Sequence, residues 1–238
     1  MSTILRPAVA MIELIFALVI MGLVLMSAPQ LISIAAKSGY VTIQQEAINE
    51  AASQVNMVMG YYWDEAITDD TYAPSVLSVS QGNSDLDETN TSGYRKGVPK
   101  LSKRSFVRSD GSRLSATVPA SLGPEGGDRD DIDDFKGDTN LTLIALSPAD
   151  YVEGDTIKIH TDITYISDTP AGGDFTPDGV HTIWFSPNLS SSSTGTTNIK
   201  RITVTLTSTA GIEELNKTIK LNAFSCNIGS TEFEEKTF

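Results

Sequence analysis

The chain has 238 residues and a formal net charge of −13, from 17 basic and 30 acidic residues. A surface this acidic argues against a nucleic-acid partner, because a phosphate backbone needs a basic patch. The single cysteine, Cys226, excludes an intrachain disulfide, and its apolar flanks predict a small buried residue.

The first element is a long apolar segment. Residues 14–28 carry no charge, and with the apolar residues before Glu13 they give about twenty positions, enough to cross a hydrocarbon core of ~30 Å. A secretory signal peptide cleaved near Ala28 would place Pro29 directly after the cut and Glu13 at the start of its apolar core. A plain transmembrane anchor fits the length but leaves Glu13 unexplained, because a carboxylate in hydrocarbon costs a few kcal/mol.

The helical pattern continues through residues 30–65. Apolar side chains recur there at intervals of three and four, which predicts one buried helical face: Ile48, Ala52, Val55, Val58, Met59 and Tyr62. Pro29 and Gly39 predict bends, since proline removes a backbone hydrogen bond. We expect the aromatic cluster Tyr61, Tyr62 and Trp63 to pack this helix onto the rest of the protein.

Beyond the helix, residues 66–238 change to short segments of period two separated by long polar loops. The predicted strands are 141–146, 156–166, 181–186, 199–207 and 217–225, and the predicted loops are 80–100, 123–139 and 168–180. In 199–207 apolar residues alternate, with one register break at Lys200–Arg201. The sequence therefore predicts an α+β protein, with a long N-terminal helix packed against an antiparallel sheet.

No pattern for catalysis is found. GxxxxGK[ST], GxSxG and HExxH motifs are absent, and His160 and His181 have no ligand pattern around them, so we expect no enzymatic activity. Residues 128–138 hold six aspartates in eleven positions. Calcium takes oxygen ligands, so one interpretation is a calcium site, although the spacing differs from that of an EF-hand: Asp128, Asp130, Asp131, Asp133 and Asp134. The other interpretation is a solvated acidic loop in which some aspartates cap turns.

The N-terminal segment RPAVAMIELIFALVIMG resembles the leader and first helix of type IV prepilins. The family has a short basic leader, a small residue before the cut, and a glutamate five positions into the mature chain. Counted from Glu13, the residue before the cut is Ala8 and the first mature residue is Val9. Gly22 and Pro29 also follow the family, although Pro29 stands one residue early. Ala8, Val9 and Ala10 depart from the common Gly, Phe and Thr or Ser.

This resemblance implies a domain organisation of leader 1–8, helix 9–65 and head 66–238, with 9–28 as the transmembrane and assembly part and 30–65 as the amphipathic part. It implies a minor pilin or pseudopilin in the bacterial inner membrane with a periplasmic head, later part of a periplasmic pseudopilus or an extracellular pilus. Calcium in a head loop also occurs in some pseudopilins.

The resemblance further implies cleavage between Ala8 and Val9 by a prepilin peptidase, methylation of Val9, and extraction by an inner-membrane assembly platform. The other partners are sibling subunits, with Glu13 facing a neighbour's terminal amine. The large head and the lack of a C-terminal cysteine pair favour a minor subunit. The competing interpretation is a membrane-anchored periplasmic binding protein or enzyme, with Trp184 and the histidines in a pocket.

Overall fold

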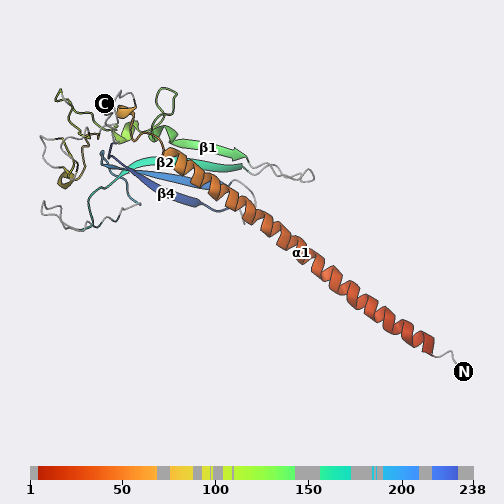
Figure 1. The fold of residues 1–238 in the computed structure, drawn as a ribbon. Coiled ribbons are helices and arrows are strands. Elements are labelled where there is room, and N and C mark those ends of the chain that lie inside the picture. Colours follow the sequence, from red (N-terminus) through yellow and green to blue (C-terminus); the bar gives the residue numbers. More distant parts are fainter. Residues whose placement is uncertain are drawn as a thin grey trace, which may run out of the picture.

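The computed structural model describes residues 5–68, 76–87, 93–96, 98, 104–108, 110–142, 156–172, 184, 186, 190–208 and 216–229; side chains at 5–9, 140–142 and 156 are not included. One long helix, α1 (Leu5–Val58), projects from a head that contains a four-stranded sheet (Figure 1). The N-terminal half of α1 extends away from the head, and its C-terminal half lies along the sheet. The fold is α+β, as the sequence predicted.

The helix is continuous through Pro29 and Gly39. Figure 1 shows no sharp kink anywhere along α1, so the predicted bends are wrong. A proline removes one backbone hydrogen bond, and here no other part of the head packs against the helix to force it to turn at that point. The predicted helix end near residue 65 is also wrong, because α1 stops at Val58 and the chain turns through Gly60, whose N–H donates to the Met57 carbonyl at 3.0 Å.

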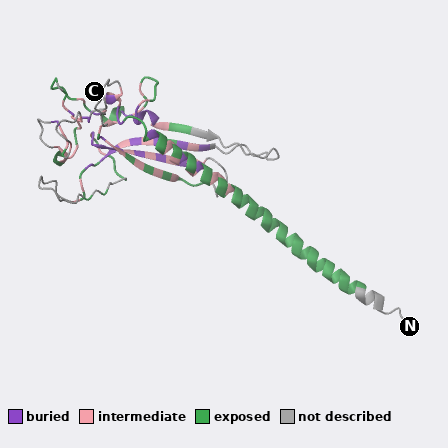
Figure 2. Ribbon diagram, viewed as in Figure 1, coloured by how far each residue is buried: buried purple, intermediate pink, exposed green. Residues whose placement is uncertain are grey.

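Burial along α1 changes sharply, as Figure 2 shows. Every residue from Ala10 to Gly39 is exposed, and the buried helix residues are Ala47, Ala51 and Val58. Small residues at this contact let the helix backbone approach the sheet closely. Of the predicted stripe, Val58 is buried, Ile48, Ala52 and Val55 are half-buried, and Met59 and Tyr62 are exposed. The helical period was therefore right, but the centre of the buried face is one residue away, on Ala47 and Ala51.

The sheet is a meander of four antiparallel strands in the order β1-β2-β3-β4. Their bounds are Gly137–Thr142, Thr156–Ile166, Ile199–Ser208 and Ile219–Cys226. Three of the predicted strands are confirmed, with small shifts at the ends of the last two. β1 starts inside the predicted loop 123–139 and overlaps the predicted strand 141–146 in its last two residues. Most of the predicted strand 181–186 lies outside the described residues, and Trp184 makes an isolated bridge with Gly172.

One face of the sheet packs against α1 and carries the core. In β2 and β3 this face is formed by alternate residues, as the pleat requires: Ile157, Ile159, Ile163, Tyr165, Ile202, Val204 and Leu206. The paired residues Tyr165 and Lys200 lie at the end of this face closest to the C-terminus of α1. Lys200 is fully buried. The register break predicted at Lys200–Arg201 is therefore explained by a lysine whose side chain faces the core.

Short 3-10 helices lie within the loops near this end of the sheet. They are η1 (Glu65–Ile67), η2 (Ser84–Leu86), η3 (Pro119–Ser121) and η4 (Asp133–Phe135). Trp63 is buried against the core, whereas Tyr61 and Tyr62 remain 39% and 46% exposed. The prediction that the aromatic cluster packs the helix onto the head therefore holds for Trp63, whose indole N–H donates to the Ser225 carbonyl at 3.2 Å, and for Tyr61, whose ring centroid lies 4.7 Å from that of Phe135.

Candidate functional site: the free helix and the buried lysine cluster

The N-terminal part of α1 is an isolated apolar helix. Ala8 and Val9, the predicted processing residues, lie in its first turns, and further along it Glu13, Gly22 and Pro29 are exposed. The helix is long and apolar enough to cross a membrane, and its most apolar stretch has none of its residues buried inside the protein. Exposure on all sides shows that this surface does not pack against the sheet of its own head.

The acidic segment is divided by the fold. Asp128 is exposed and Asp130 is half-buried, whereas Asp131, Asp133 and Asp134 are buried. The interpretation as a fully solvated loop is therefore wrong for these three residues. The segment is held to the end of α1 by the Ile132 N–H, which donates to the Tyr62 carbonyl at 2.9 Å.

Two of the buried aspartates cap their own loop, as the turn-capping interpretation predicted. Asp131 Oδ1 accepts hydrogen bonds from the N–H groups of Asp133 at 2.7 Å and Asp134 at 3.1 Å. Asp134 accepts from the N–H groups of Asp130 at 3.0 Å and Glu125 at 3.1 Å. These bonds satisfy buried main-chain donors that would otherwise have no partner, so the carboxylates serve the local structure.

Asp133 faces a buried lysine instead. Nζ of Lys200 lies 2.5 Å from Asp133 Oδ1 and 3.0 Å from Asp64 Oδ2, and it donates to the Trp63 carbonyl at 2.7 Å. The side-chain exposed fractions of Lys200, Asp64 and Asp133 are 0%, 0% and 1%. The rings of Trp63 and Tyr165 lie 4.7 and 5.7 Å from the nitrogen. We call these five residues the lysine cluster.

Asp64 is the best-satisfied member of the lysine cluster. Its oxygens accept hydrogen bonds from the N–H of Ala66, from the N–H and hydroxyl of Thr117, and from the Tyr165 hydroxyl. The Tyr165 hydroxyl also lies 2.6 Å from the Thr117 carbonyl, and its burial beside Asp64 raises the pKa of Tyr165 far above its usual range. Asp64 therefore links the end of α1, the Thr117 loop and β2.

The carboxyl groups next to the lysine cluster hold protons more tightly than usual. Burial, and then the charge of Asp133, raise the pKa of Asp131 from 3.8 to about 8. Asp131 Oδ2 is buried with no hydrogen-bond partner, and an ionised carboxylate is costly in that position. Partial burial and the nearby Asp130 raise the pKa of Glu65 from 4.5 to about 7. At neutral pH this region therefore carries less negative charge than its aspartates would imply.

Calcium remains a prediction. Within the described residues no group of three or more His, Cys, Asp or Glu side chains is placed to hold a metal ion. Asp133 is paired with Lys200, and Asp131 and Asp134 accept main-chain hydrogen bonds, so an ion would have to compete with these contacts. Asp128 is exposed, whereas these three aspartates are buried.

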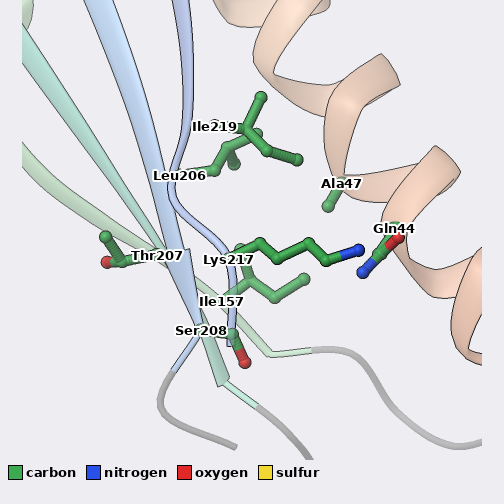
Figure 3. A pocket seen from close by; sticks show the side chains of 8 residues that line it. All are labelled: Gln44, Ala47, Ile157, Leu206, Thr207, Ser208, Lys217 and Ile219. Atoms are coloured by element: carbon green, nitrogen blue, oxygen red, sulfur yellow. The ribbon is translucent and has the colours of Figure 1, made fainter. Parts of the chain in front are cut away.

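A small cavity between α1 and the sheet is lined by aliphatic and neutral polar side chains and one lysine: Gln44, Ala47, Ile157, Leu206, Thr207, Ser208, Lys217 and Ile219 (Figure 3). Lys217 reaches across its mouth toward Gln44. With one titratable side chain, this cavity offers no acid–base pair.

Trp184 and His160, two of the residues named for the competing interpretation, do not line this cavity. Trp184 is 68% exposed, and His181 lies outside the described residues. His160 lies on the outer face of the sheet, where its Nδ1 is 2.6 Å from Asp138, and the neighbouring Lys158 and His160 lower the pKa of Asp138. Cys226, predicted to be buried, is half-buried, and this burial raises the pKa of its thiol.

The sequence did not single out Asp64 or Lys200 as site residues. The register break at Lys200 was a signal, because counting back from Leu206 in steps of two places this lysine on the buried face. Comparisons with protein-family models, curated proteins and solved structures gave no match. The fold by itself defines an α+β protein with an N-terminal helix that can cross a membrane.

Proposed function

We propose that this protein is a minor pilin or pseudopilin, a structural subunit of a type IV pilus or a type II secretion pseudopilus. The subunit is inserted in the bacterial inner membrane by residues 9–28, with its head in the periplasm. A prepilin peptidase removes residues 1–8 and methylates Val9, and an assembly platform moves the subunit into the fibre. The work of the protein is assembly rather than catalysis.

The observation that supports this proposal most is the division of α1 into two halves. From Ala10 through Gly39 every residue is exposed, while Ala47, Ala51 and Val58 attach the second half to the sheet. A helix held rigidly by its far end can move from lipid into a bundle of equivalent helices at low net cost, because both surroundings are apolar. Because residues 6–22 resemble prepilins, the bundle in this proposal consists of the packed N-terminal helices of pilin or pseudopilin subunits.

Glu13 has a defined role in this proposal. It is the single charged residue between Arg6 and Lys37, so it is the one group in the apolar half that requires a cation. After cleavage, the amine of Val9 in a neighbouring subunit supplies that cation. A charge pair in low dielectric selects one axial register among packed helices, even where it adds little net stability.

Processing is tested by the intact mass of the protein extracted from the membrane. We expect a chain that begins at Val9 and carries one added methyl group. A chain that begins at Pro29 would identify a cleaved signal peptide. An uncut chain would favour the competing class, a membrane-anchored binding protein or enzyme.

Assembly is tested by Glu13→Ala, compared with Glu46→Ala as a matched control on the exposed surface of the same helix. We expect the Glu13 variant to accumulate in the membrane and to be lost from sheared fibres, while the Glu46 variant enters them normally. Incorporation of the Glu13→Ala subunit at the wild-type level would refute the role given to this carboxylate.

A further inference from the structure

The lysine cluster places an amine between two carboxyl groups where water is excluded. Nζ of Lys200 is 2.5 Å from Asp133 Oδ1 and 3.0 Å from Asp64 Oδ2, and none of the three side chains is more than 1% exposed. The aromatic rings of Trp63 and Tyr165 lie beside the nitrogen. In such a medium a charged pair is costly, and proton transfer to give a neutral amine becomes easier than in water.

The two carboxyl groups have different surroundings. Asp64 accepts hydrogen bonds from the Ala66 and Thr117 main chain and from the hydroxyls of Thr117 and Tyr165, which fix it in place. Asp133 accepts one close hydrogen bond from Lys200 and a long one, 3.4 Å, from the Gly123 N–H. Asp133 is therefore the freer group, and Asp64 is the better-positioned proton acceptor.

We propose that Lys200 and Asp133 form an intramolecular isopeptide bond, with Asp64 transferring the proton. A first proton passes from the Lys200 ammonium to Asp133, which gives a neutral amine and a carboxylic acid. The amine nitrogen then attacks the carboxyl carbon of Asp133, a new C–N bond forms, and the bond from this carbon to the hydroxyl oxygen breaks. Asp64 takes the second proton from the nitrogen and returns it to the leaving hydroxyl, which departs as water. The ammonium and carboxylate together become a secondary amide and one water molecule, so no oxidant, activating nucleotide or other reactant is needed.

The position of the contact favours this reaction. The nitrogen already touches an oxygen of its target, so rotation about the last side-chain bonds brings it onto the carboxyl carbon. The partners come from η4 and from β3, which the chain brings together across 67 residues. A covalent link there would tie η4 to the start of the inner strand β3, at the end of the sheet closest to the C-terminus of α1. The proposal rests on the head alone and does not depend on the proposed function.

The test is mass spectrometry of the full chain, purified in detergent and denatured before analysis. Amide formation removes one water, so we expect the intact mass to be about 18 Da below that of the same chain without the link, apart from any N-terminal processing. Trypsin should then release peptide 130–136 joined to peptide 159–201, because the modified Lys200 is no longer cleaved. The joined peptide distinguishes this bond from loss of water elsewhere in the chain.

Three variants sharpen the test. Lys200→Arg keeps a positive charge but lacks the reactive amine, and we expect the full mass. Asp64→Asn keeps both bonding groups and should abolish or greatly slow the linkage. Lys158→Arg, in an exposed pair with Asp138, should leave the joined peptide unchanged. A wild-type protein that melts cooperatively, carries its full mass and yields free peptide 130–136 would overturn the proposal and leave the lysine cluster as a buried ion pair.

Discussion

Replacing Asp131 with asparagine should stabilise the protein at neutral pH. In the structure, Asp131 Oδ1 accepts two main-chain hydrogen bonds and Oδ2 is buried without a donor. Asparagine keeps the accepting oxygen and replaces Oδ2 with an NH2 group that can donate to the adjacent Asp133. The substitution therefore imitates the protonated aspartate and removes the cost of keeping that proton.

The size of the effect follows from proton linkage. The pKa of Asp131 rises from 3.8 in the unfolded chain to about 8 in the folded protein. Between these values the folded state binds the extra proton, so the wild-type free energy of unfolding falls as pH rises, by about 1.4 kcal/mol per pH unit for this group. Between pH 5 and pH 7 the stability advantage of Asp131→Asn should therefore grow by about 3 kcal/mol.

The assay is urea denaturation of both proteins in the same detergent at pH 5, 6 and 7. The pKa of Glu65 is also raised, to about 7, so the variant should retain part of the pH dependence. The informative quantity is the difference between the wild-type and variant slopes of the free energy of unfolding against pH, because Glu65 contributes to both slopes. Parallel curves across this range, or a variant that becomes less stable than the wild type at pH 7, would show that Asp131 is ionised in the folded protein.

Two further predictions concern the acidic segment and the packing of the helix. Addition of a calcium chelator should leave the melting temperature of the full chain unchanged, because Asp133 is already paired with Lys200; a clear decrease would establish a calcium site. Ala51→Leu should destabilise the head by about 1–3 kcal/mol, because Ala51 is 0% exposed against the sheet and a larger side chain must separate the two. Glu50→Leu, at the neighbouring exposed position, is the control. An equal loss of stability in that variant would contradict this packing argument.

The long helix and three of the four strands could be predicted because their signals are local. The charge-free run of 14–28 and the alternation in 156–166 and 199–207 each follow from spacing within one segment. The errors are also local in origin. Pro29 predicts a bend because proline lacks a backbone N–H. The helix nevertheless continues through Pro29, which is exposed and packs against no other described element. The buried stripe was placed one residue away because Ala47 and Ala51 carry little hydrophobic signal.

Local spacing in the sequence was enough to predict the inward alternation of Ile202, Val204 and Leu206 and the lone carboxylate at the start of an apolar helix, whereas Lys200 was interpreted as a register break. What meets Lys200 depends on how the elements pack together. Trp63 and Asp64 both follow the end of α1, Asp133 begins η4, and Tyr165 lies in β2. A buried charge requires compensation, but partners so far apart in the chain are chosen by the packing of helix on sheet, which no short-range pattern encodes.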